Sequence, residues 1–166
     1  MTRLPLAAMT QTGIGIRNRT TTGRGGDKAM VIGAVRRKGN VVARVVENVK
    51  RATIEAFVTQ TVSNRVSLLC TDDFRSYDRI GRKYNHQVVN HSAGEHARYG
   101  VLNKYGIAAV VHTNTIEGFW SLIKRGIMGS FHKVSHKYLP LYVAEFQFRY
   151  NNRENPDIFG TAIRGC

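Results

Sequence analysis

The hydrophobic positions in the first half of the chain predict β-strands with one helix between them. Two apolar runs rich in β-branched residues, 30–35 and 41–46, flank a basic Gly-Asn turn and predict a β-hairpin. Residues 53–62 have the spacing of an amphipathic helix, and residues 66–71 are typical of a short buried strand. This order of hairpin, helix and strand favours an α/β fold around one sheet.

The second half of the chain shows mostly helical periodicity. Residues 137–151 give the strongest pattern, because their large apolar side chains recur on one helical face. The other expected elements are a short helix at 74–84, a strand at 86–90, an exposed loop at 92–108 and a helix at 114–125 closed by Gly126. Helices on the faces of a mixed sheet are therefore expected.

The two ends of the chain lack such patterns. We expect residues 1–28 to be a basic, flexible segment and residues 154–166 to be a loose tail, with one domain at 29–153. If the first segment contacts phosphate, Arg24 and Lys28 are its candidate contacts. The alternative is an arm that binds nothing.

Charge narrows the class of partner. Lys and Arg number 25 against 11 acidic residues, which gives a formal charge of +14 in 166 residues. Such an excess favours nucleic acid over a membrane surface, since no basic amphipathic helix stands out. A ribosomal-type or merely soluble basic protein is the alternative. Two cysteines and the lack of a long apolar run indicate a reduced, cytoplasmic protein that does not span a membrane.

Asp72 and Asp73 stand where the strand at 66–71 ends. A strand end fixes the backbone of a carboxylate that faces a cleft, and carboxylate oxygens suit Mg²⁺. The alternative is structural, because either aspartate could be the N-cap of a following helix.

The segment 112–126, HTNTIEGFWSLIKRG, carries further candidate chemistry. Glu117 and Lys124 lie about two helical turns apart, so both project from one face. Glu117 is a candidate metal ligand, while Lys124, with Arg125 beside it, is a candidate phosphate contact. The alternative for Glu117 is a capping box with Asn114. The neighbouring Phe119 and Trp120 are expected to be core residues.

Other chemistries have little support in the sequence. The six histidines are scattered without cysteine or carboxylate partners at zinc-site spacing, and we interpret them as surface and loop polarity. The stretch GRGGDK lacks the spacing of a phosphate-binding loop, and there is no G-x-S-x-G.

Several blocks together resemble the DDE domain of small bacterial insertion-sequence transposases, over about residues 24–153. The blocks are MVIGAVRRKGNVVARVV, TDDFRSY and the long run HTNTIEGFWSLIKRGIMGSFHKVSHKYLPLYVAEFQFRYNNR. The resemblance implies an RNase H-like fold, a mixed central sheet flanked by helices. It also implies Mg²⁺- or Mn²⁺-dependent cleavage and transfer of DNA strands.

The resemblance also implies individual roles. Asp72 matches the second aspartate of the family and Glu117 the third acid, with Asn114 as a competing or helping ligand. Lys124 matches the lysine two turns after that acid. The implied partners are the terminal inverted repeats of a transposon and target DNA, bound by a homo-oligomer near the nucleoid.

The start of the chain departs from the family pattern. The family's first aspartate lies on the strand before the hairpin, and here the matching stretch is AMTQTGIG at 8–15. No acid precedes Asp27. We therefore expect an N-terminally truncated copy with its first strand missing or altered and with impaired catalysis. Two alternatives are a non-catalytic DNA-binding remnant that occupies transposon ends or joins full-length subunits, and a nuclease acting on RNA–DNA hybrids.

Overall fold

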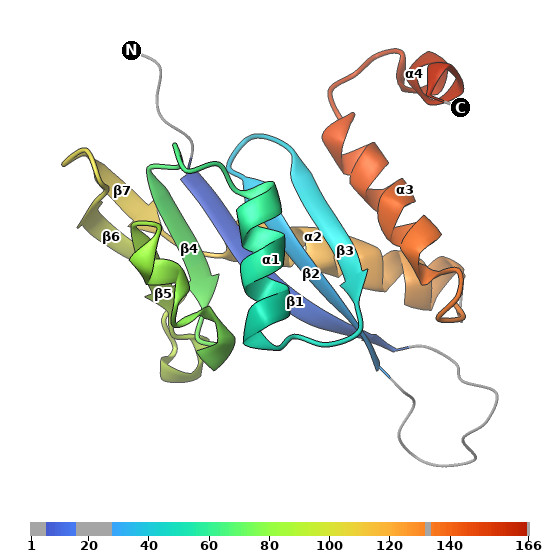
Figure 1. The fold of residues 1–166 in the computed structure, drawn as a ribbon. Coiled ribbons are helices and arrows are strands. Elements are labelled where there is room, and N and C mark those ends of the chain that lie inside the picture. The colour runs from blue at the N-terminus through green and yellow to red at the C-terminus, as the bar shows by residue number, and fades with distance from the viewer. Residues whose placement is uncertain (1–5, 16–27, 132–133, 166) are drawn as a thin grey trace.

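A mixed five-stranded sheet of order β3-β2-β1-β4-β5 forms the centre of the computed structural model (Figure 1), which describes residues 6–15, 28–131 and 134–165. Its strands are β1 (Leu6–Gly15), β2 (Lys28–Arg36), β3 (Val41–Val46), β4 (Leu68–Asp72) and β5 (His86–Val89). β1 pairs antiparallel with β2 and parallel with β4, so it is the central strand.

Helices cover both faces of this sheet (Figure 1). Helix α1 (Arg51–Thr61) packs one face through Ile54, Phe57 and Val58. Helix α2 (Asn114–Arg125) packs the opposite face through the apolar side chains of Ile116, Phe119, Trp120 and Ile123. Successive side chains of a strand point to opposite faces of the sheet, so alternate residues belong to the hydrophobic cores under α1 and α2. Two layers of side chains thus hold β1 and β4 in place.

Helix α3 (Leu139–Asn151) lies along β3, the strand at one edge of the sheet. Asn151 binds both backbone groups of Val41, since Oδ1 accepts from the Val41 N–H over 2.7 Å and Nδ2 donates to the Val41 carbonyl over 2.9 Å. Gln147 Oε1 accepts from the Ala43 N–H at 2.7 Å. These side chains satisfy backbone groups that an edge strand otherwise leaves open.

The other elements are short. They are 3-10 turns at Arg75–Tyr77, Ile80–Arg82 and His91–Ala93, the two-stranded sheet of β6 (Arg98–Leu102) and β7 (Ala108–Val111), a π-helical turn at Gly126–Ser130, and α4 (Ile158–Arg164). Within the described residues, no helix combines the length and the apolar character needed to cross a membrane.

The structure confirms most of the elements predicted from periodicity. The predictions that hold are the hairpin at 30–46, the helices at 53–62, 114–125 and 137–151, and the strands at 66–71 and 86–90. The helices among them show the spacing of one buried face, whereas β2 and β4 are short apolar runs buried on both faces.

The prediction of a missing first strand is wrong, and so is that of flexibility for Leu6–Gly15. This segment is a strand bonded on both sides, to β2 and to β4. Its own alternation is weak, and pairing with two neighbours overrides that weak preference. The predicted boundary at residue 28 therefore cuts through the sheet. Arg24 and Asp27 lie outside the described residues.

Four other predictions were wrong in part. The tail contains α4, whose start is capped because the Asp157 carboxylate accepts from the Gly160 N–H. The expected helix at 74–84 is two 3-10 turns, and the expected loop at 92–108 contains β6. Gly126 does not end the helical path, which continues as a π-helical turn that buries Ile127.

Candidate functional site

A cavity of about 240 Å³ opens where β4 ends, between the sheet and α2. The residues that line it are Thr10, Asp72, His91, Glu117, Trp120, Ser121 and Lys124. The fold therefore brings Asp72, Glu117 and Lys124 to one cavity, although they come from a strand and from two turns of a distant helix.

Asp72 is the last residue of β4 and is partly buried. The pKa of its carboxyl group is raised to about 6, and burial is the main cause. The hydrogen bond from its own backbone N–H and the charge of His91 lower this pKa, whereas the negative charges of Glu117 and Asp73 add to the rise. Its Oδ1 atom is buried without a hydrogen-bond partner in the described part of the chain. A carboxylate in this condition is suited to a cation, which would supply the missing interaction.

Glu117 projects from the first turn of α2 and is held by two neighbours. Its Oε1 accepts a 2.5 Å hydrogen bond from the Thr113 hydroxyl and lies 2.8 Å from His91 Nε2. His91 Nε2 also lies 2.9 Å from the Thr113 hydroxyl. The three side chains form one cluster that fixes the direction of the carboxylate toward the cavity.

Thr10 lies beside Asp72 on the adjacent strand, because the parallel register pairs Met9 with Thr71. Its side chain is 3% exposed, and its Oγ1 accepts a 2.7 Å hydrogen bond from the indole N–H of Trp120. The Trp120 ring fits over Gly33 of β2, where a Cβ atom would come within 2.6 Å of it. A neutral hydroxyl thus stands next to the Asp72 carboxylate.

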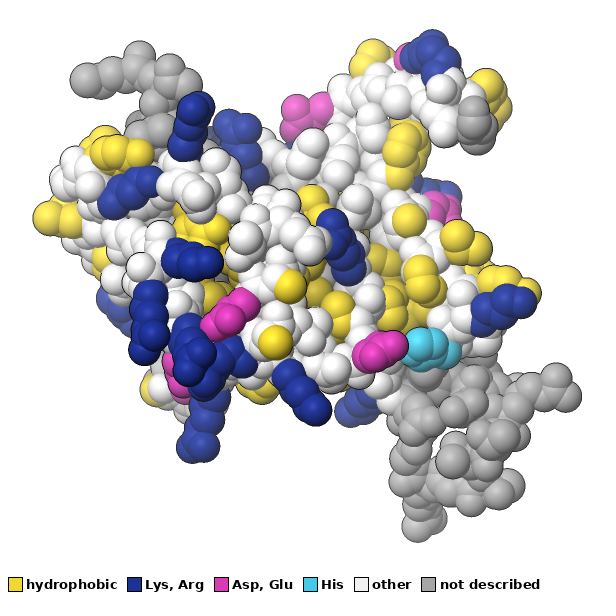
Figure 2. Space-filling model, viewed as in Figure 1, with side chains coloured by type: hydrophobic (Ala, Val, Ile, Leu, Met, Phe, Trp, Pro, Cys, Tyr) yellow, Lys and Arg dark blue, Asp and Glu magenta, His cyan; other side chains and the backbone are white. Residues whose placement is uncertain are grey.

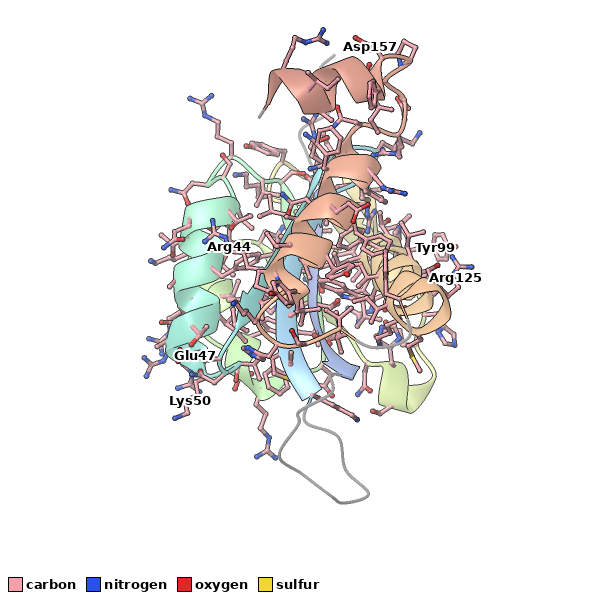
Figure 3. The ribbon with its side chains drawn as sticks, turned by 90° about the vertical axis from the view of Figure 1, so that its right-hand side faces the viewer. Arg44, Glu47, Lys50, Tyr99, Arg125 and Asp157 are labelled. Atoms are coloured by element: carbon pink, nitrogen blue, oxygen red, sulfur yellow. The ribbon has the colours of Figure 1, made fainter. Side chains whose placement is uncertain are left out.

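Lys124 and Ser121 extend the cavity along the exposed face of α2. Glu117, Ser121 and Lys124 recur at the helical spacing that aligns them on one side. Arg125 does not line the cavity, and Figure 3 shows it on the side of α2 that faces away from the sheet. Of these two cations, Lys124 alone therefore lines the cavity.

Two other candidate residues lie elsewhere. Asn114 is exposed and does not line the cavity. The N-cap of α2 is Thr113, so the alternative of a capping box between Asn114 and Glu117 does not hold. Lys28 is exposed at the start of β2, paired with Gly15 rather than with the part of β1 that reaches the cavity.

Sequence reasoning missed three residues of the cavity, Thr10, His91 and Ser121. His91 was interpreted with the other histidines as surface polarity, which is wrong for this residue. Its position one residue after the strand at 86–90, parallel to the strand of Asp72, was the available signal. Thr10 was hidden because its strand was not recognised. The prediction that Phe119 and Trp120 are core residues is confirmed.

The carboxylates limit what the cavity can hold. Among the described residues, no group of three or more His, Cys, Asp or Glu side chains is placed to hold one metal ion. Asp72 and Glu117 offer two carboxylates that face one cavity. This set fits a single hard cation that keeps several waters, as Mg²⁺ does with one or two carboxylates. It does not fit a pair of ions that share bridging carboxylates.

The order of the strands and the helices on both faces of the sheet define an RNase H-like fold. The structure is similar to the HTLV-2 integrase catalytic core domain in complex with magnesium, with a TM-score of 0.50 and 11% identity over 90% of this chain and 88% of that one. A pre-cleavage Mos1 transpososome aligns with a TM-score of 0.39 and 14% identity, over 87% of this chain and 53% of that one.

A sequence comparison identifies the family. The model of the ISXO2-like transposase domain matches residues 9–151, so the chain belongs to this family of DDE transposase domains, whose class of activity is DNA transposition. A search of curated proteins gave no match. The match begins at Met9, within β1, and so includes the strand that carries Thr10.

Proposed function

We propose that this protein binds DNA through the cavity at the end of β4 and that its Mg²⁺-dependent strand cleavage and transfer are impaired. One observation carries the proposal: Thr10 occupies the position beside Asp72 where the family pattern expects the first aspartate. A threonine hydroxyl brings no negative charge to a cation. The strand itself is present, so the proposed defect lies in one side chain and not in the architecture.

Asp72 and Glu117 are the proposed ligands of Mg²⁺ or Mn²⁺. A divalent cation held by these two carboxylates would supply Lewis-acid activation of the attacking water or 3′-hydroxyl. Two carboxylates hold one such ion weakly, because ligand number and charge set the affinity for hard cations. The buried Oδ1 of Asp72, which lacks a partner in the described part of the chain, supports a cation at this point.

Lys124 is the proposed contact to a phosphate of the bound strand. Its ammonium group lies at the exposed rim of the cavity, two turns from Glu117 and next to Arg125 in the chain. A lysine at this position orients the backbone and reads no base. The formal charge of +14 supports strong, salt-dependent binding of transposon ends and target DNA.

Oligomerisation on DNA remains part of the proposal. The HTLV-2 integrase core is described in a dimeric and a trimeric form. In this chain, α4 carries the exposed apolar side chains of Phe159 and Ile163. Exposed apolar groups of this size are typical of surfaces that another copy covers.

The test combines binding and cleavage on a duplex with a family-type inverted repeat. We expect DNA binding to fall steeply with salt, to survive Asp72→Asn and to weaken in Lys124→Gln. Calorimetry should detect weak Mg²⁺ binding that Asp72→Asn abolishes, and nicking should stay near background. Robust, Asp72-dependent nicking would overturn the proposed impairment, and a lack of DNA binding at low salt would overturn the whole proposal.

The alternative is a protein that only occupies DNA and holds no cation. Such a protein would bind DNA in the same way as the proposed one. Calorimetry distinguishes the two, because this alternative predicts no Mg²⁺ binding that depends on Asp72. The buried Oδ1 of Asp72, which has no hydrogen-bond partner among the described residues, favours the cation.

A further inference from the structure

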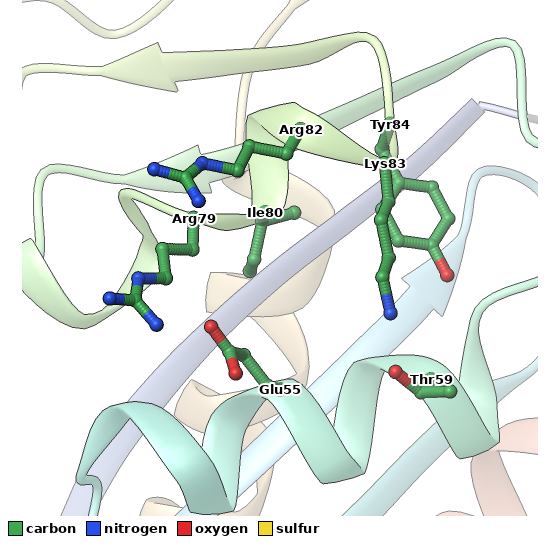
Figure 4. A pocket seen from close by; sticks show the side chains of 7 residues that line it. All are labelled: Glu55, Thr59, Arg79, Ile80, Arg82, Lys83 and Tyr84. Carbon is green, nitrogen blue, oxygen red and sulfur yellow. The ribbon is translucent and has the colours of Figure 1, made fainter.

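A second cavity, of about 200 Å³, lies between α1 and the turn Ile80–Arg82, on the face of the sheet opposite to α2. Figure 4 shows Arg79, Arg82 and Lys83 extending from this turn, with the Lys83 ammonium directed toward α1. Ile80 and Tyr84 form its apolar floor and are buried. Two buried anchors thus fix the backbone from which three cationic side chains extend.

The three cations have no compensating partners. Arg79, Arg82 and Lys83 are exposed, and none forms an ion pair within the described residues. Glu55 of α1 is the one carboxylate that lines this cavity. Figure 2 shows dark-blue side chains gathered beside α1, over the segment that carries the two 3-10 turns. Like charges held this close repel each other, and a bound polyanion relieves that repulsion.

We propose that this basic surface, formed by Arg79, Arg82 and Lys83, binds the phosphates of a DNA duplex at a place distinct from the cavity of Asp72. Guanidinium and ammonium groups are the usual donors to phosphate oxygens. The surface lies on the segment that connects the end of β4 to the start of β5, through Arg75–Tyr77 and this turn. It shares no lining residue with the cavity of Asp72.

The contact is independent of base sequence. Beside the cations, the cavity offers the Thr59 hydroxyl and the Glu55 carboxylate as polar groups, and its remaining wall is apolar. Phosphate contacts position a duplex without reading bases. This inference rests on the proposed function, because it extends the DNA path from the α2 side of the sheet to the α1 side.

The test measures the salt dependence of binding to a labelled duplex of unrelated sequence. The variant is Arg79→Gln/Arg82→Gln/Lys83→Gln, which keeps polar side chains at these positions and removes three charges. The matched control, Lys38→Gln/Arg65→Gln/Lys137→Gln, removes three charges from exposed sites on separate segments. Circular dichroism and the thermal midpoint establish that both variants fold. Single variants at Arg79 and Lys83 serve if the triple variant does not.

We expect the slope of log affinity against log salt to become shallower by about 2–3 in the triple variant and by about 0.9 in each single variant. The matched control should keep the slope of the wild-type protein. A triple variant that binds like its control would overturn the inference.

A variant of the α2 side, Lys124→Gln/Arg125→Gln, separates this inference from the proposed function. Weakened binding in that variant alone would reject the basic surface and leave the proposed function standing. Weakened binding in both, with effects that add in the combined variant, supports two distinct contacts. If the unmodified protein does not bind the duplex, both proposals fail.

Discussion

The indole N–H of Trp120 donates a 2.7 Å hydrogen bond to the Thr10 hydroxyl, joining α2 to the central strand beside Asp72. Thr10 therefore has a structural partner in addition to its place in the cavity. A carboxylate at the same position could accept the same hydrogen bond, because the indole is a donor only. The pocket is thus shaped for an acceptor at residue 10 and currently contains a neutral one.

The stability of the protein should depend on pH through Asp72. Its folded-state pKa of about 6 lies above the ordinary value of 3.8, so the folded state binds the proton more tightly than the unfolded state. Stability should therefore fall as pH rises from about 4 to about 6 and then level off. The total loss is about 3 kcal/mol at most, from 1.36 kcal/mol for each pKa unit.

The variant Asp72→Asn isolates this effect. It should be more stable than the wild-type protein at pH 8 and similar to it near pH 4, when both are measured by urea unfolding without divalent cations. Added Mg²⁺ should reduce the difference at pH 8 by stabilising the wild-type protein alone. Equal stability of the two proteins at every pH would show that the Asp72 carboxylate is well solvated.

Replacing Asn151 by alanine should destabilise the fold and expose an edge of the sheet. Asn151 provides both partners of the Val41 backbone groups. Their loss should cost about 1–3 kcal/mol, the range for polar groups left without partners, and should promote association through β3. Urea unfolding and size-exclusion chromatography measure the two effects.

The next residue supplies the control. Asn152 donates to the Phe148 carbonyl within its own helix and makes no hydrogen bond to β3 in the described structure. Asn152→Ala should lower stability by less than about 1 kcal/mol and leave the protein in its wild-type association state. Equal stability and equal association of the two variants would show that Asn151 does not protect the edge of the sheet.

Two glycines of the α2 segment should respond in opposite directions to alanine. A Cβ at Gly126 would lie 2.1 Å from the Phe146 ring, so Gly126→Ala should cost about 1–3 kcal/mol by forcing α2 and α3 apart. Gly118 has open space around it, and Gly118→Ala should stabilise the helix by about 0.5–1 kcal/mol. Urea midpoints of the two variants on the same side of wild type would contradict this packing.

Apolar periodicity predicted the elements that carry a clear hydrophobic pattern. It failed for β1, where pairing with neighbouring strands determines the secondary structure. The hairpin and the three long helices carry their own apolar spacing. β1 mixes small and polar residues, and its two neighbouring strands make it a strand. The helix α4 depends on the Asp157 cap, a local signal that was overlooked in a polar tail.

The sequence predicted only those site residues that lie at the end of a recognisable strand or on one face of a recognisable helix. Asp72, Glu117 and Lys124 follow from those two rules. His91 and Thr10 reach the cavity through strand register, which periodicity does not specify. Asn114 and Arg125 belong to the same helix as Glu117 but do not line the cavity. Proximity in sequence therefore predicted more site residues than the fold brings together.

Strand cleavage by the Thr10→Asp variant shows whether a carboxylate at residue 10 restores activity to the cavity. The measurement is the initial rate of Mg²⁺-dependent nicking of an inverted-repeat duplex, with Thr10→Asn as the uncharged control of the same shape and Thr10→Asp/Asp72→Asn as the control for the site. We expect the initial nicking rate to rise about 10-fold or more in Thr10→Asp alone, which corresponds to an activation barrier lower by about 1.4 kcal/mol or more. This expectation is contradicted if Thr10→Asp folds, binds the duplex and nicks it no faster than the wild-type protein.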